Sequence, residues 1–83
     1  MKTQITVLFF AQLKERFGLE LLKLDLPAGA RAGDVFKHLD VDEAEQKELC
    51  RFVRLAVNHA YVDQEHALKS GDTVALIPPV SGG

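Results

Sequence analysis

The first predicted strand carries apolar side chains on both of its faces, and this feature limits most strongly what the chain can fold into. Residues 5–10 are rich in β-branched and aromatic residues, which is typical of a strand. Successive side chains of a strand point to opposite sides of the sheet, and here both sides hold apolar groups: Ile5, Val7 and Phe9 on one, and Thr6, Leu8 and Phe10 on the other. A chain of 83 residues is too short for a second core or for helices over both faces. We therefore expect helices on one face of the sheet only.

The remaining strands follow from alternation and from turn residues. Leucine alternates with charged residues over positions 22–26, and Pro27 ends this second strand. Residues 54–62 predict a strand, a turn at Asn58-His59 and a short return strand. A Ser-Gly-Asp turn at 70–72 then leads into the last strand, Thr73–Ile77.

Helical spacing accounts for most of the other apolar residues. Residues 11–17 predict a short helix that ends at Gly18, because glycine accepts the left-handed conformation common at helix ends. A second amphipathic helix is predicted by the i, i+3, i+4, i+7 spacing of Ala32, Val35, Phe36 and Leu39. Asp42 and Glu45 resemble a capping box that opens another helical stretch, with its inward residues at Leu49, Phe52 and Val53. The order of elements predicts an α+β fold.

Composition argues against several classes of function. The net charge is −2 and Lys and Arg form no stripe, so we expect no nucleic-acid binding. There is no apolar run of membrane-spanning length, so no membrane partner is expected either. Cys50 is the single cysteine and reads as a small packed side chain rather than a nucleophile. These features favour the reducing cytoplasm.

No metal site is expected. The histidines His38, His59 and His66 share no metal-ligand spacing with one another or with Cys50. A calcium loop beginning at Asp40 would need glycine at its sixth position and glutamate at its twelfth, and the chain has glutamate and arginine there. The chain also lacks a phosphate-binding glycine loop and a Gly-x-Ser-x-Gly motif, so we expect no active site within the domain itself.

The C-terminal tail is the strongest candidate for chemistry. Pro78 and Pro79 fix their φ angles and disfavour helix, so the tail should leave the sheet in an extended form. Ser81, Gly82 and Gly83 add almost no side chain, so they suit a channel too narrow for a Cβ atom. A terminal carboxylate is a poor electrophile, and activation as an acyl-adenylate would supply a leaving group. A tail with no role is the simpler alternative.

A candidate partner surface lies beside this tail. If Val74 and Leu76 face the core, Ile77 faces out, and Phe10 lies on the same outer side of the sheet. With Tyr61 these residues would form an exposed apolar patch, which is typical of partner sites. An apolar edge left incompletely covered explains the same pattern equally well.

Three segments together resemble the small-subunit family of molybdopterin synthase, whose members are ubiquitin-like sulfur carriers. They are VLFFAQLKERFG at 7–18, RLAVNHAYV at 54–62 and LKSGDTVALIPPVSGG at 68–83. The resemblance implies a ubiquitin-like β-grasp domain over residues 1–77, with a mixed sheet, helices on one face and an extended tail over 78–83. It implies no bound cofactor and no catalysis by this chain alone.

The same resemblance implies a role for the terminal residue. An adenylyltransferase related to ubiquitin-activating enzymes would use ATP to adenylate Gly83, which then becomes a thiocarboxylate. The large catalytic subunit would take up the tail in a heterotetramer, and sulfur would pass to cyclic pyranopterin monophosphate in molybdenum cofactor biosynthesis. The implied site residues are Gly83 and Gly82 for the chemistry, with a partner interface of Phe10, Tyr61, Ile77, Pro78, Pro79, Val80 and Ser81.

Two other functions remain open from the sequence. Sulfur carriers for thiamine synthesis or tRNA thiolation share the Gly-Gly end, although they generally lack the LFFA opening and the Pro-Pro pair. A ubiquitin-like modifier or docking module would use the same fold without sulfur chemistry. Whether the chain ends in a carboxylate or a thiocarboxylate, and which partner receives the tail, distinguishes these alternatives.

Overall fold

The computed structural model describes residues 2–79, so the predicted site residues Val80, Ser81, Gly82 and Gly83 lie outside the described part. The elements in chain order are β1 (Lys2–Phe9), α1 (Ala11–Phe17), β2 (Leu21–Pro27), the 3₁₀ helix η1 (Ala32–His38), α2 (Glu43–Phe52), β3 (Arg54–Val57), β4 (Ala60–Val62) and β5 (Thr73–Ile77). None of the helices within residues 2–79 has the length and apolar character needed to cross a membrane.

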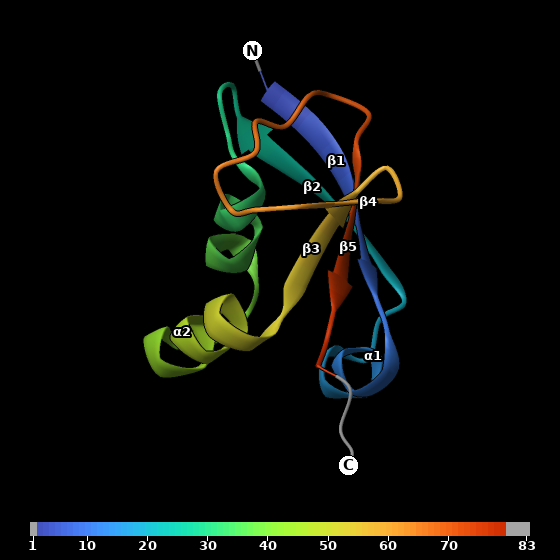
Figure 1. Cartoon of the computed structure of the whole chain (residues 1–83), viewed down its shortest axis with the longest axis vertical. Helices are drawn as coiled ribbons and strands as arrows, with labels where there is room; N and C mark the ends of the chain where they lie inside the picture. Colours follow the sequence, from blue (N-terminus) through green and yellow to red (C-terminus); the bar gives the residue numbers. More distant parts are fainter. Residues whose placement is uncertain (1, 80–83) are drawn as a thin grey trace.

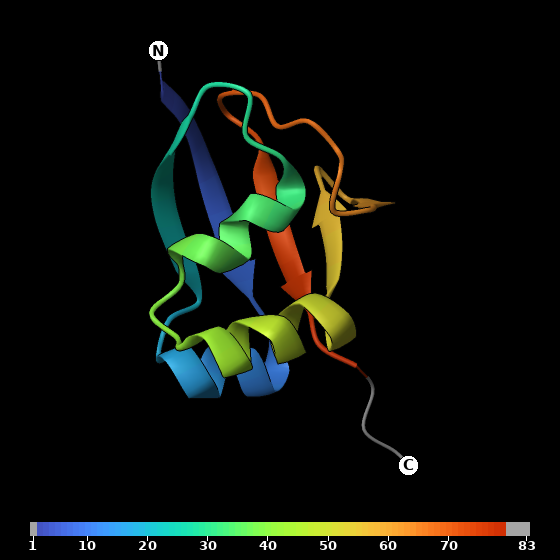
Figure 2. The same cartoon turned by 90° about the vertical axis from the view of Figure 1, so that its left-hand side faces the viewer.

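The five strands form one mixed sheet in the order β2-β1-β5-β3-β4. The central pair, β1 and β5, is parallel, and every other neighbouring pair is antiparallel. Figures 1 and 2 show η1 and α2 in front of one face of the sheet, while α1 lies at the end toward which β1 and β5 both run. This arrangement confirms the predicted α+β fold with helices on one face.

The core lies between the sheet and its helices. Alternate residues of β1 and β5 point into it, and Val7 and Val74 are fully buried. Phe36 of η1 is the largest fully buried side chain, and burial of such a ring stabilises the fold by roughly 1.5–3 kcal/mol. At the α1 end, Phe17 packs on Phe9 with ring centroids 5.2 Å apart. The intervening side chains of these strands point to the second sheet face, which carries no helix.

Helix α1 confirms the sequence prediction and α2 modifies it. Gly18 ends α1 with a φ of 70°, and its N–H donates to the carbonyl of Lys14. At the start of α2, the carboxylate of Asp42 accepts the N–H of Glu45 at 2.8 Å. The predicted capping box is nevertheless half formed, because the Glu45 carboxylate accepts from two nitrogens of the Arg16 guanidinium instead, Nη2 at 2.6 Å and Nε at 2.8 Å. An ion pair between two helices thus replaces the local bond.

Two helix predictions differ from the structure. The segment Ala32–His38 is wound as a 3₁₀ helix. The N–H of Asp34 donates to the carbonyl of Arg31 and that of Leu39 to Phe36, each three residues back as in the tighter winding. Phe52, which was expected to face inward, is 53% exposed. Leu49 and Val53 face the core as predicted, and Cys50 packs against it as well. The exposed Phe52 ring lies under the guanidinium of Arg51, 5.3 Å from its centroid.

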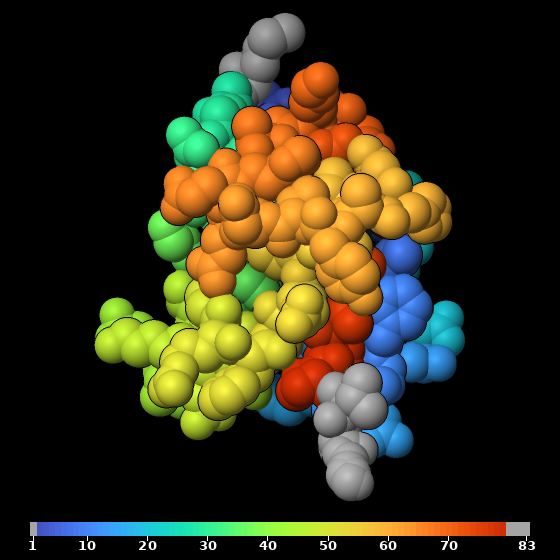
Figure 3. Space-filling model, in the orientation of Figure 1, coloured from blue at the N-terminus to red at the C-terminus, as the bar shows by residue number. Residues whose placement is uncertain are grey.

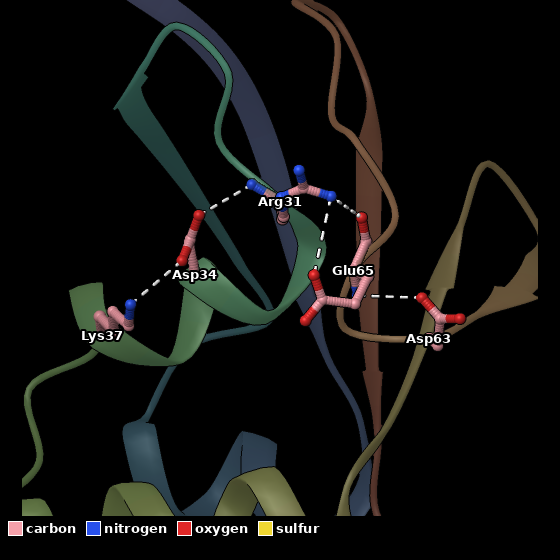
Figure 4. Close-up of polar contacts among 5 residues, drawn as sticks. All are labelled: Arg31, Asp34, Lys37, Asp63 and Glu65. Carbon is pink, nitrogen blue, oxygen red and sulfur yellow. Dashed lines mark hydrogen bonds and ion pairs between the residues drawn. The ribbon is translucent and has the colours of Figure 1, made fainter.

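The long connection between β4 and β5 is fastened to η1 by polar contacts (Figure 4). The Arg31 guanidinium donates to the carbonyl of Glu65 at 2.8 Å and lies 3.7 Å from its carboxylate. The Arg31 N–H donates to Asp34 at 2.8 Å, and Lys37 pairs with that carboxylate at 3.3 Å. These contacts tie the start of η1 to the connection that leads to β5.

Candidate functional site

The outer sheet face contains a groove that brings the predicted partner residues together. Phe10, Tyr61 and Ile77 all line it, and its volume is about 370 Å³. The remaining lining residues come from β1, β3, β5 and the turn before β4: Leu8, Ala56, Asn58, His59, Thr73 and Ala75. Three residues that are far apart in the sequence thus share one concave surface, although their role in binding stays a prediction.

Strand register explains why this surface is apolar. Leu8 of β1 lies opposite Leu21 on one side and Ala75 on the other. Ala75 lies opposite Ala56, which lies opposite Tyr61. One row of apolar residues therefore crosses all five strands on the face that carries no helix. The sequence identified Leu8 and Tyr61, but the pairing that aligns them with the two alanines follows from register alone.

The groove is open to solvent along its aromatic wall. Phe10 is 46% exposed and Tyr61 is 68% exposed, whereas Ile77 is half-buried. Figure 3 shows the red surface of β5 beside the blue surface of β1, with no helix over either strand. Exposed aromatic side chains around an apolar floor are typical of protein-binding surfaces. Within residues 2–79 this face stays uncovered, which is what the patch prediction required.

The other end of the groove is polar and held by hydrogen bonds. Asn58 and His59 have φ values of 51° and 75°, as a tight turn between β3 and β4 requires, and this confirms the predicted turn. The Asn58 side chain donates to Asp72 at 2.9 Å and accepts the N–H of Thr73 at 3.0 Å. These bonds tie the hairpin to the start of β5, so the apolar row has a fixed polar border.

The root of the tail lies at the apolar end of the groove. Ile77 closes β5 opposite Arg54, and Pro78 and Pro79 follow it directly. The side-chain amide of Gln12, the second residue of α1, reaches the carbonyl oxygen of Pro79 at 3.5 Å. Since β1 and β5 are parallel, the helix that follows β1 and the tail that follows β5 emerge at the same edge of the sheet.

A larger hollow of about 760 Å³ beside α1 is a weaker candidate. Its walls include Lys14 and Glu20, which pair with each other at 2.6 Å on an exposed surface. The hydrogen bond from Lys14 lowers the pKa of the Glu20 carboxyl. Charges that satisfy each other in water offer little to a ligand, so the groove on the sheet remains the better site.

Neither a nucleophile nor a metal centre emerges from the described residues. Cys50 is half-buried, and burial raises the pKa of its thiol, which disfavours the reactive thiolate at neutral pH. Within residues 2–79, no three His, Cys, Asp or Glu side chains gather closely enough to hold a metal ion. The two glycines predicted to carry the chemistry, Gly82 and Gly83, lie beyond this part of the chain.

Comparison with known proteins identifies the family. The ThiS family profile matches residues 7–83. The molybdopterin synthase sulfur carrier subunit of Chlamydomonas reinhardtii is 35% identical over 82 residues, covering 96% of this chain and 99% of that protein. The corresponding subunit of Dictyostelium discoideum is 34% identical over 86 residues, and both chains are covered completely at 100%.

Solved structures agree with this assignment. A Pyrococcus furiosus protein provisionally named molybdopterin converting factor, subunit 1, has a TM-score of 0.75 at 27% identity, covering 94% of this chain and 99% of its own. A complex of subunits 1 and 2 of the Helicobacter pylori molybdopterin-converting factor contains a match with a TM-score of 0.64 at 27% identity, covering 98% and 100%. A Caldiarchaeum subterraneum ubiquitin shares the fold, with a TM-score of 0.64 at 19% identity and 100% coverage of both chains.

The predicted ubiquitin-like β-grasp is therefore confirmed by sheet order, by helix placement and by structural similarity. The similarity to sulfur carrier subunits extends over essentially the whole chain and through the Gly-Gly end. The family match and the identities to known relatives show that this chain belongs to the ThiS family, and it is similar over its whole length to molybdopterin synthase sulfur carrier subunits.

Proposed function

We propose that this chain is the sulfur carrier subunit of a molybdopterin synthase and that Gly83 carries the sulfur. The observation that supports this most directly is the end-to-end similarity to molybdopterin synthase sulfur carrier subunits at 34–35% identity. The family match also includes the last residue of the chain, where the chemistry would take place.

The chemistry needs a second enzyme because a carboxylate is unreactive toward nucleophiles. In the proposed sequence, an adenylyltransferase joins the Gly83 carboxylate to the α-phosphate of ATP and releases pyrophosphate. A sulfide-level donor then attacks the acyl carbon and displaces AMP, which leaves a thiocarboxylate. Transfer of that sulfur to cyclic pyranopterin monophosphate, with addition of water at the carbonyl, returns the carboxylate for another cycle. This chain acts in each step as substrate or donor, and the catalytic groups belong to its partners.

The groove on the outer sheet face is the proposed docking surface for the large subunit. It lies beside Pro78 and Pro79, so a protein bound there would stand next to the origin of the tail. Phe10 and Tyr61 offer exposed aromatic area at its rim, and Ile77 contributes to its floor. A complex of the two subunits is known for the Helicobacter pylori molybdopterin-converting factor, which supports a partnership of this kind.

Mass spectrometry of protein isolated from its native cells tests the proposal. Trypsin cleaves after Lys69 and releases the peptide SGDTVALIPPVSGG, which contains neither methionine nor cysteine. Oxidation at sulfur therefore cannot imitate the mass change that accompanies replacement of oxygen by sulfur. We expect a thiocarboxylate at Gly83, formed in vitro only when the activating enzyme, ATP and a sulfur donor are all present.

Reconstitution distinguishes this pathway from the alternatives. The thiocarboxylated chain should convert cyclic pyranopterin monophosphate when mixed with the large subunit of molybdopterin synthase. Sulfur transfer exclusively to a thiamine precursor or to tRNA would assign the chain to another sulfur pathway. A tail that stays a plain carboxylate under full activation conditions, and is found joined to lysine side chains, would identify a modifier instead.

A further inference from the structure

Two distinctive sequence segments meet beyond the C-terminal ends of the central strands β1 and β5. The opening LFFAQLKE and the closing PPVSGG are separated by most of the chain, yet Gln12 of the first contacts Pro79 of the second across 67 residues of sequence. The amide nitrogen Nε2 of Gln12 lies 3.5 Å from the carbonyl oxygen of Pro79. Gln12 is exposed and contributes nothing to the core, so packing does not explain its presence there.

Backbone geometry explains why the Pro79 carbonyl is an effective point of control. A proline ring fixes its own φ, and it also confines the residue before it to extended conformations. Ile77 and Pro78 are each followed by proline, so their ψ angles are restricted, and the φ angles of Pro78 and Pro79 are set by their rings. The ψ angle of Pro79 is the first unrestricted torsion after β5. The direction of the Pro79 carbonyl reports that angle directly.

The contact gives the Pro79 carbonyl a hydrogen-bond partner within the protein, beyond the end of the β5 ladder. Pro78 and Pro79 have no N–H groups, so they cannot continue the hydrogen-bond ladder of β5. Among the described residues, the amide of Gln12 is the one side-chain group that bonds to either proline. At 3.5 Å the bond is long, so it biases the Pro79 torsion without locking it.

We propose that Gln12 is a positioning residue for the C-terminal tail. Its amide holds the Pro79 carbonyl and so selects the direction in which the chain leaves the sheet. This inference rests on the proposed function, because a sulfur carrier must present Gly83 to more than one enzyme. A preferred direction at Pro79 raises the fraction of chains whose tail is already aligned to enter a partner's active site. The entropic cost of binding each partner is then lower.

Two substitutions separate the hydrogen bond from the shape of the side chain. Gln12→Met has a similar length and helix propensity but no N–H donor, whereas Gln12→Lys restores a donor. Glu15→Met introduces the same new side chain one turn along α1, at an exposed residue whose side chain forms no hydrogen bond or ion pair among residues 2–79. Both positions face solvent, so none of the three variants should change stability.

Carbonyl ¹³C NMR on the free, uniformly labelled full chain tests the contact without any sulfur chemistry. The Pro79 carbonyl resonance should move in Gln12→Met, return toward its original position in Gln12→Lys and stay in place in Glu15→Met. A resonance that is the same in Gln12→Met as in the unmodified chain would overturn the inference. This readout holds whichever carrier or modifier pathway the chain serves.

Single-turnover sulfur transfer tests the consequence for function. Thiocarboxylated variants are mixed with excess large subunit of molybdopterin synthase, so that differences in affinity do not limit the rate. Gln12→Met should be slower by about two- to fivefold, at or below the factor that one hydrogen bond contributes. Gln12→Lys should recover part of that loss. Equal rates in Gln12→Met and Glu15→Met would refute the positioning role, whereas absence of thiocarboxylate on the unmodified chain would refute the proposed function alone.

Discussion

The substitution Ile77→Asp separates binding from folding. In the free chain Ile77 is half-buried on the outer face and lies directly opposite Arg54 in register. Replacement removes about 1 kcal/mol of apolar burial. A cross-strand pair of the new carboxylate with Arg54 returns about 0.2–1 kcal/mol. The free energy of unfolding should therefore fall by less than about 1 kcal/mol.

Binding should respond much more strongly. If the large subunit covers the groove, docking removes water from the new carboxylate and from Arg54 together. Desolvation of an ion pair generally costs more than the attraction returns, and we expect a penalty of about 2 kcal/mol or more. The dissociation constant would then rise about thirtyfold or more.

A matched control lies on the same sheet face. Thr6→Asp makes the same change in charge, and Lys23 lies opposite that position just as Arg54 lies opposite Ile77. Thr6 is outside the lining of the groove. Isothermal titration calorimetry with the large subunit should give a large loss of affinity for Ile77→Asp and little change for Thr6→Asp. If both variants bind as tightly as the unmodified chain, the interface lies elsewhere. If both lose affinity to the same extent, the loss is a general effect of charge.

Three further predictions concern the tail and the fold. Deletion of residues 82–83 should abolish sulfur transfer in the reconstituted synthase while urea unfolding stays unchanged, because residues 2–79 contain the sheet and its core. Gly33→Ala should reduce the free energy of unfolding by about 1–3 kcal/mol, because a Cβ there would lie 2.8 Å from the Cβ of Gln64. The pKa of the Asp34 carboxyl is lowered mainly by the N–H of Arg31, so its stabilisation is present above the ordinary carboxyl pKa and is lost as the pH falls. Urea titrations across acidic pH should therefore show a shallower loss of stability in Asp34→Asn.

Local patterns predicted most elements because their causes are local. The alternation at 22–26 and the turn at Asn58-His59 depend on neighbouring residues, and both appear in the structure as expected. The capping box at Asp42 depends on neighbours as well, but its second half failed because Arg16 from another helix bound Glu45 more effectively. Local rules hold until a distant charged group offers a stronger bond.

The sequence by itself determined the apolar face, the tail and the family resemblance. Alternation required that Phe10 and Ile77 turn away from a one-sided core. The Gly-Gly end can be read directly from the sequence. Tertiary structure decided how these features combine. The parallel pairing of β1 with β5 brings Gln12 to Pro79, and strand register aligns Leu8 with Ala75 in one apolar row. Register and crossover depend on contacts between distant segments, so no periodicity within one segment could specify them.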